Sequence, residues 1–184
     1  MLAAAIADDD PVLFVEHKLL YPRPLLEAGA GELVDFQVTR GSGPYPCFRL
    51  QPAQPARLTL ATYGYNFELV RQAALELVYE REIFAEIVLF SQLSPFELGP
   101  LFESLARTRR LLTVEEGTLT LGWGAEVAAR AVEALDGLRV RRAAALDLPI
   151  ANSKPLEDAI LPSPERIVRA ALSLLQENPR SNPG

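Results

Sequence analysis

The sequence has few of the residues that build reactive or metal-binding sites. Its 184 residues include one cysteine, one methionine, one histidine and one tryptophan. A single cysteine, Cys47, cannot form an internal disulfide, which is typical of proteins from a reducing compartment. Because His17 is the only histidine, no cysteines and histidines stand at ligand spacing, and we expect no transition-metal site.

Positive charge is also in short supply. The chain has 18 basic and 24 acidic residues, a formal charge of −6 and a pI near 4.9. Binding to nucleic acid requires a positive surface that neutralises phosphates. The basic clusters are interrupted by apolar residues and consist of Arg107, Arg109, Arg110, Arg141 and Arg142. We therefore expect no nucleic-acid partner.

Long apolar runs are absent from the sequence. No stretch of about 18 apolar residues could span a bilayer. The opening MLAAAIADDD lacks the basic flank and the longer apolar stretch of a secretory signal, so we expect a cytoplasmic protein with no membrane contact. Residues typical of a helix end follow Met1 at once, which favours a start internal to a longer polypeptide. The alternative is a short gene with its own start.

From Leu58 onward, short apolar runs alternate with amphipathic helices. This alternation is typical of strand–helix–strand units around a largely parallel sheet. Asn66, Ser94 and Ser163 are each placed to cap a helix, and Ser94 is followed by a proline and by Glu97 at capping-box spacing. The predicted strands are Leu58–Tyr63, Ala85–Phe90, Leu111–Val114 and Val140–Asp147.

The first fifty-odd residues lack this alternation. Pro11–Lys18 and Leu33–Arg40 are strand-like, but proline- and glycine-rich segments leave no room for a helix between them. The segment 41–56 holds four prolines and is predicted to run extended over the surface. This part of the chain is interpreted as the tail of a preceding domain plus a linker.

Two features could carry chemistry. His17 stands beside Glu16 and is a candidate general base, but no motif places a serine or cysteine nucleophile near it, so a structural role is favoured. The segment 117–126, GTLTLGWGAE, invites comparison with a phosphate-binding loop. Its glycines lack G-x-G-x-x-G spacing and no P-loop lysine follows, so tight turning and helix packing explain them better.

Acidic residues at the ends of strands suggest a different role. Glu115 and Glu116 end the third predicted strand, where open parallel sheets often place functional groups; they could bind a partner or simply be solvated. Glu126 can pair with Arg130 across one helical turn. The alanine-rich helix that contains them suggests a dimer. The candidate partner interface consists of Glu115, Glu116, Gly122, Gly124, Glu126 and Asp147.

Six segments, in order along nearly the whole chain, resemble a known family: the beta subunits of the pyruvate and branched-chain 2-oxo acid dehydrogenases, in the transketolase superfamily. The proline-rich connection Arg40–Arg57 is longer than the one usual in that family. The matching segments are Asp10–Tyr21, Leu58–Gly64, Ala85–Glu97, Thr108–Gly117, Gly122–Arg130 and Asp147–Val168.

The resemblance implies a fold and a division of the chain. The fold would be α/β, the three-layer arrangement of a transketolase carboxy-terminal domain with a mixed, mostly parallel, five-stranded sheet. Residues 1–21 would be a remnant of the pyrimidine-binding domain and 22–56 an extended proline-rich linker. Residues 57–177 would be the carboxy-terminal domain and 178–184 a flexible tail.

The resemblance also implies a function. The parent enzyme would be an oxidoreductase that decarboxylates a 2-oxo acid with thiamine diphosphate and magnesium and passes the acyl group to lipoamide. This chain would be the dimerisation and docking region, inactive alone, without catalytic, cofactor-binding or metal-binding residues. Its partners would be the alpha subunit or upstream domains, a second beta subunit and the acyltransferase core. The alternatives are a free-standing interaction module without catalysis, or a fragment of a transketolase or deoxyxylulose-phosphate synthase.

Overall fold

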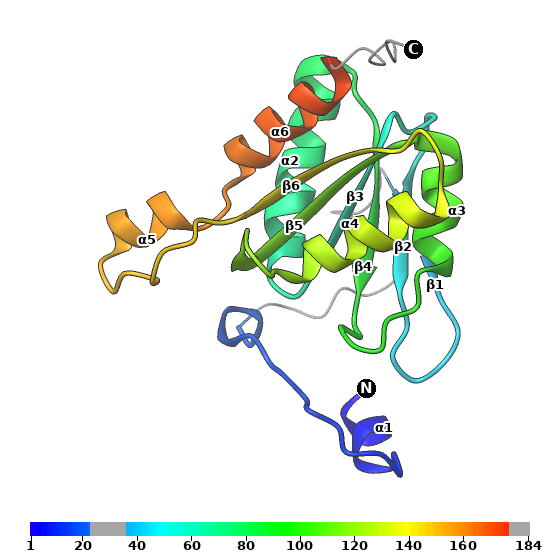
Figure 1. Cartoon of the computed structure of the whole chain (residues 1–184), viewed down its shortest axis with the longest axis vertical. Helices are drawn as coiled ribbons and strands as arrows, with labels where there is room; N and C mark the ends of the chain where they lie inside the picture. Colours follow the sequence, from blue (N-terminus) through cyan, green and yellow to red (C-terminus); the bar gives the residue numbers. More distant parts are fainter. Residues whose placement is uncertain (23–35, 177–184) are drawn as a thin grey trace.

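The computed structural model describes residues 1–22 and 36–176 and builds most of them around one β-sheet (Figure 1). The sheet has six strands in the order β1-β2-β4-β3-β5-β6. The strands are β1 (Phe36–Arg40), β2 (Phe48–Pro52), β3 (Leu58–Tyr63), β4 (Ala85–Phe90), β5 (Arg110–Thr118) and β6 (Arg139–Ala145).

The four strands β3 to β6 run parallel because a helix separates each from the next along the chain. The predicted α/β class and the mostly parallel sheet are therefore confirmed. The strand count was wrong: a hairpin of β1 and β2 adds to β4 in antiparallel direction and brings the total to six.

The hairpin also corrects the predicted linker at 22–56. Phe36 and Leu50 bury their side chains in the core, with 9% and 2% of their surface exposed, which fixes both strands on the sheet. Pro44 and Pro46 lie in the turn between the strands, and Pro52 ends β2, so no proline removes a central hydrogen bond. Composition alone suggested an extended linker. The segment forms a hairpin instead because Phe36 and Leu50 are buried against the sheet.

Helices cover both faces of the sheet. On one face α2 (Asn66–Arg81) and α6 (Pro164–Gln176) pack against each other and against residues such as Leu60 and Leu112. On the other face α3 (Gly99–Thr108) and α4 (Trp123–Ala134) pack over a second cluster. That cluster consists mainly of Ala61, Val88, Phe90, Leu101, Leu105, Leu111 and Val127. Two apolar layers thus hold the strands between two helical layers.

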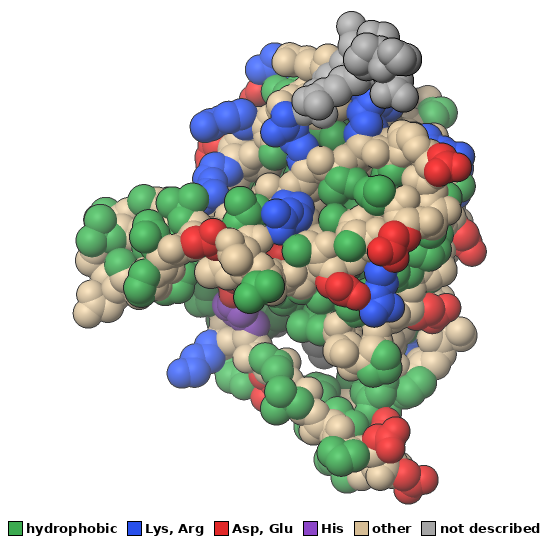
Figure 2. All heavy atoms as spheres, viewed as in Figure 1, with side chains coloured by type: hydrophobic (Ala, Val, Ile, Leu, Met, Phe, Trp, Pro, Cys, Tyr) green, Lys and Arg blue, Asp and Glu red, His purple; other side chains and the backbone are tan. Residues whose placement is uncertain are grey.

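A short arm projects from the sheet edge after β6. It contains α5 (Lys154–Ile160) and the preceding loop, and Figure 1 shows it standing away from the body of the domain. In Figure 2 the same arm is largely covered by hydrophobic side chains. Leu148, Ile150 and Leu156 expose 54%, 51% and 61% of their surface there. Grouped exposed apolar side chains of this kind are typical of surfaces that contact another molecule.

The amino-terminal segment lies beside the domain and includes α1 (Leu2–Ile6) and a single 3₁₀ turn at Lys18–Leu20. The strand predicted at Pro11–Lys18 was wrong. Within the described residues no strand lies beside it to pair with its backbone, and Leu13 and Val15 expose 89% and 75% of their surface. The predicted tail 178–184 and residues 23–35 of the predicted linker lie outside the described residues.

None of the helices that the structure describes is long and apolar enough to cross a membrane.

Candidate functional site

The carboxyl ends of β3, β4, β5 and β6 meet at one edge of the sheet, because parallel strands all end on the same side. The acidic pair Glu115–Glu116 of β5 lies there, and so does the start of α4. The amino-terminal segment reaches the same edge through His17. We define the carboxyl edge as these three features and the loop from Thr118 to Gly122.

Glu115 is the centre of the carboxyl edge. Its side chain is 1% exposed, and its two oxygens accept the backbone N–H groups of Trp123 at 2.9 Å and Gly124 at 2.7 Å. Both donors belong to the first turn of α4, where helix N–H groups have no partner inside the helix and the helix dipole favours a negative charge. Glu115 therefore fixes the start of α4 against the end of β5.

The glycines around the Glu115 carboxylate leave it the space that a side chain would fill. A Cβ atom on Gly117 would lie 2.5 Å from Glu115 Oε2, and a Cβ on Gly122 would lie 2.6 Å from Oε1. On Gly124 it would lie 2.8 Å from Oε1 and 2.4 Å from Thr113 Oγ1. The interpretation of these glycines as packing positions is therefore confirmed.

Two opposing influences act on the Glu115 carboxyl. Burial is the stronger one and raises its pKa, while the N–H groups of Gly124 and Trp123 and the charge of Arg142 lower it. Both oxygens are engaged by backbone donors and shielded from solvent. The carboxylate therefore serves as a structural clamp, and a substrate cannot reach it from solvent.

Glu116 connects the carboxyl edge to the amino-terminal segment. Its two oxygens lie 3.2 Å from His17 Nε2, and the His17 ring stacks on Tyr65 with 5.1 Å between centroids. His17 Nδ1 accepts the N–H of Leu19 at 3.2 Å, which leaves Nε2 to donate to Glu116. Both ring nitrogens of His17 are thus engaged in contacts, and its structural role stays a prediction.

The loop after β5 is anchored on its other side by Asp147. Its carboxylate accepts the N–H of Thr120 at 2.9 Å and the Thr120 hydroxyl at 2.7 Å, and these bonds lower the pKa of Asp147. Arg142 donates to the Leu119 carbonyl at 2.6 Å. Between these anchors, Leu121 has a φ of 58° and exposes 96% of its surface. A fully exposed leucine in the left-handed region is held there by its fixed neighbours.

An aromatic cluster lies next to Glu115. Trp123 packs edge-to-face against Tyr63 and Phe90, with 5.1 Å between centroids in each pair, and against Phe96 at 6.2 Å. Burial first, and then the charges of Glu115 and Glu116, raise the pKa of Tyr63 to about 12. Tyr63 is therefore neutral at physiological pH and acts as packing. Sequence reasoning missed this cluster, although the Tyr63-Gly64-Tyr65 turn at a strand end was a signal for it.

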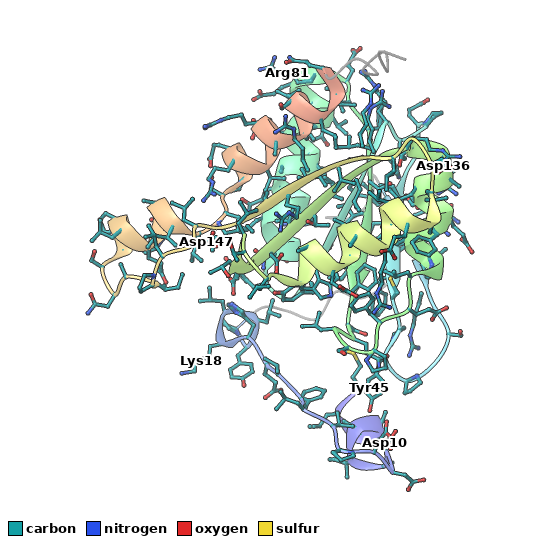
Figure 3. The ribbon with its side chains drawn as sticks, viewed as in Figure 1. Asp10, Lys18, Tyr45, Arg81, Asp136 and Asp147 are labelled. Carbon is teal, nitrogen blue, oxygen red and sulfur yellow. The ribbon has the colours of Figure 1, made fainter. Side chains whose placement is uncertain are left out.

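The six predicted interface residues do not form one patch. Glu115, Gly122 and Gly124 come together as the clamp, and Glu116 follows Glu115 on β5. Asp147 lies at the base of the arm, where Figure 3 labels it. Glu126 pairs with Arg130 at 2.7 Å on the exposed side of α4. Glu115, Gly122 and Gly124 thus serve the clamp, whereas Glu116, Glu126 and Asp147 are accessible to a partner.

The residues at this edge do not fit thiamine diphosphate and magnesium. The first-turn N–H groups of α4, which could otherwise hold a diphosphate, are already bound to Glu115. In the parts of the chain that the structure describes, no group of three or more histidine, cysteine, aspartate or glutamate side chains could hold a metal ion. We derive no cofactor chemistry from this chain.

One cavity of about 370 Å³ lies beside the β1–β2 turn and the end of β4. Cys47 and Glu97 line it, and burial raises the pKa of the Cys47 thiol to about 12. The thiol is therefore protonated at physiological pH, the form that is not nucleophilic.

A family model and the sequences of known proteins point to the same family. Residues 51–167 match the transketolase C-terminal domain. The chain is 33% identical over 95% of its length to a Drosophila melanogaster mitochondrial pyruvate dehydrogenase E1 component subunit beta. It is 32% identical over 96% of its length to a Bacillus subtilis acetoin:2,6-dichlorophenolindophenol oxidoreductase subunit beta. It covers 47% and 49% of these two relatives, so it spans about half the length of the curated relatives it matches.

Among solved structures, a split-gene transketolase described as an inactive beta4 tetramer aligns with a TM-score of 0.60 at 23% identity. The alignment covers 69% of this chain and 42% of that one. A 2-oxoglutarate:ferredoxin oxidoreductase from Magnetococcus marinus aligns with a TM-score of 0.50 at 15% identity, over 71% of this chain and 20% of that one. At these identities the two structures support the fold alone.

Proposed function

Because the chain belongs to the transketolase C-terminal domain family, we propose that it is the dimerisation and docking region of a 2-oxo acid dehydrogenase beta subunit. Its parent would use thiamine diphosphate and magnesium, and this region would be inactive alone. The partners would be an alpha subunit or upstream domains, a second beta subunit and an acyltransferase core. Residues 1–21 would be the end of the preceding pyrimidine-binding domain. The cytoplasmic location of the protein stays a prediction.

The observation that carries this proposal has two parts. The buried Glu115 carboxylate is fully engaged in holding α4, and apolar side chains near the carboxyl edge are exposed. At the carboxyl edge the buried carboxylate of Glu115 holds the start of α4 and is not available to a substrate. At the same edge of the molecule Leu121 and the arm residues Leu148, Ile150 and Leu156 are exposed. An interface needs apolar anchors of this kind, and pre-organised anchors lose little entropy on binding.

The first test addresses assembly. Sedimentation velocity of the full chain between about 5 and 200 μM should show a concentration-dependent dimer. Leu148→Asp with Leu156→Asp should shift it to monomer, because a charge in an apolar interface is desolvated without a partner. Val38→Asp is a matched control, since Val38 is 46% exposed on β1 at the opposite edge of the sheet. A monomer at all concentrations would remove self-association from the proposal.

The second test addresses activity. Calorimetric titration of the chain with thiamine diphosphate and magnesium should give no tight binding. Micromolar affinity would overturn the claim that the chain is inactive alone. The alternative of a free-standing interaction module is separated by the sequence upstream of Met1: a continuous reading frame encoding a pyrimidine-binding domain supports the subunit, and a stop codon supports the module.

A further inference from the structure

The opposite edge of the sheet, where the parallel strands begin, carries a cluster of arginines. Arg57 precedes β3, Arg110 is the first residue of β5 and Arg139 is the first residue of β6. Figure 2 shows Lys and Arg side chains gathered over the upper part of the molecule, where Figure 1 places the start of β6 and the end of α6. In a chain of net charge −6 this is a local excess of positive charge.

The sheet register brings the arginines of this cluster together. Arg110 and Arg139 are direct partners across the parallel pair β5–β6, so their side chains leave the same face of the sheet side by side. Arg110 Nη1 lies 3.5 Å from the Arg57 carbonyl oxygen, which brings the end of the loop before β3 to the same place. Arg57 is exposed and Arg110 and Arg139 are partly exposed, so a small solute can approach them.

Nothing in the described part of the chain neutralises these three guanidinium groups. No carboxylate of the described residues lies within 4.0 Å of a nitrogen of Arg57, Arg110 or Arg139. By contrast, Arg49, Arg107 and Arg130 each have an acidic partner. Like charges held side by side without a counter-charge repel one another and destabilise a fold. A bound anion would neutralise this repulsion.

Arg110 has unused hydrogen-bonding capacity. Its Nε atom is buried without a partner, and its Nη1 atom makes only two long contacts, of 3.5 Å each, to the carbonyl oxygens of Arg57 and Thr108. A guanidinium carries five N–H donors in a planar fork that matches phosphate. Burial and then the charges of Arg139 and Arg57 lower the pKa of Arg110, which is the effect expected of crowded cations.

We propose that Arg57, Arg110 and Arg139 form a binding site for a phosphate group, carried either by inorganic phosphate or by a small phosphate ester. Three convergent positive charges favour a dianion over a monoanion such as chloride or acetate. The ligand would bridge the starts of β3, β5 and β6. The site lies at the edge opposite Glu115 and does not depend on the proposed function.

The site is tested by calorimetry and thermal unfolding of the full chain. Inorganic phosphate should bind saturably and raise the Tm more than sodium chloride at the same ionic strength, which controls for simple screening of like charges. Arg110→Gln and Arg139→Gln should each weaken phosphate binding about tenfold, the loss expected for a charge-assisted hydrogen bond. Arg109→Gln should leave it unchanged, because Arg109 donates instead to the Asp136 carbonyl at 3.0 Å.

Stability without phosphate separates this proposal from a purely structural role. If the arginines lack an anion, Arg110→Gln should leave the Tm in chloride unchanged or raise it, because a repulsive charge is removed. A lowered Tm together with no difference between phosphate and chloride would overturn the proposal. Glycerol 2-phosphate separates the two sources: binding equal to that of inorganic phosphate supports an ester ligand, and much weaker binding supports the free ion.

Discussion

The carboxylate of Glu115 accepts the backbone N–H of Gly124 at 2.7 Å from a position that is almost completely buried, and it does so at the point where β5 ends and α4 begins. The contact joins two elements separated by a tight loop. It also explains why glycine stands at Gly122 and Gly124, because a Cβ at either position would meet a Glu115 oxygen closer than 3.0 Å.

Gly124→Ala should destabilise the fold. Its Cβ would lie 2.4 Å from Thr113 Oγ1, and Thr113 is buried in a strand that cannot move aside. We expect the free energy of unfolding in urea to fall by about 1–3 kcal/mol, the usual cost of overpacking a core. Gly99→Ala is the control, since its Cβ would meet its nearest atom, Glu97 Oε1, at 3.4 Å. Equal effects of the two changes would contradict the clamp.

Glu115 should also give the fold a dependence on pH. Burial raises the pKa of Glu115 above the ordinary value of 4.5, so the folded state binds its proton more readily than the unfolded state. The contribution of Glu115 to stability is therefore largest below pH 4.5 and declines as the pH rises through the folded pKa. Urea unfolding of the wild type and Glu115→Gln across this range should show the stability difference shrinking with pH. A difference independent of pH would argue that the pKa is unshifted.

Sequence reasoning recovered the four parallel strands but misjudged the ends of the chain. Leu58–Tyr63 and Ala85–Phe90 were predicted to the residue because their apolar and β-branched composition is local. The strand β1 lies within the predicted strand-like segment Leu33–Arg40, but β2 and its pairing with β1 were missed because they depend on burial of residues such as Leu50 against distant strands. Pro11–Lys18 was overpredicted for the opposite reason: its composition suits a strand, but no described neighbour pairs with it.

The start of the helix predicted at Ser94 was also placed wrongly by local sequence rules. The structure begins α3 at Gly99, with Pro100 in its first turn. The sequence offers two proline-containing starts within a few residues, and local rules cannot choose between them. Among the site residues, the pairing of Glu126 with Arg130 could be predicted from helical spacing, whereas the contact of His17 with Glu116, 99 residues apart, could not.

Glu86→Gln should destabilise the fold. Its carboxylate is 3% exposed within β4 and binds Arg49 at 2.9 Å and Arg107 at 2.6 Å, which ties β2 and α3 to the centre of the sheet. Neutralising this buried carboxylate should cost about 1–3 kcal/mol, because Arg49 keeps its ion pair with Glu103 and Arg107 is half exposed. Glu126→Gln is the control, because its exposed pair with Arg130 is worth at most about 0.5 kcal/mol. Urea unfolding of both variants measures the contrast, and a small effect at Glu86 would contradict it.

His17→Ala should release the amino-terminal segment from the carboxyl edge. The change removes the contact with Glu116 and the stacking on Tyr65, which together are worth about 1–2 kcal/mol at a partly exposed site. Trypsin cleavage after Lys18 should become about tenfold faster, as this energy implies. Tyr21→Phe removes only a bond to Glu16 inside the segment and should change little. Equal cleavage of wild type and His17→Ala would mean that other contacts hold the segment.

Leu121→Gly should have different effects on the stability of the fold and on self-association. The leucine has a φ of 58° and is almost fully exposed, so glycine relieves backbone strain and loses little burial. We expect the free energy of unfolding to rise by up to about 1 kcal/mol or to stay unchanged. If Leu121 is an interface anchor, the same variant should weaken self-association in sedimentation velocity, because exposed apolar anchors stabilise complexes and not the free fold. Stability and association would then change in opposite directions. A variant that is less stable but assembles normally would show that Leu121 serves the fold.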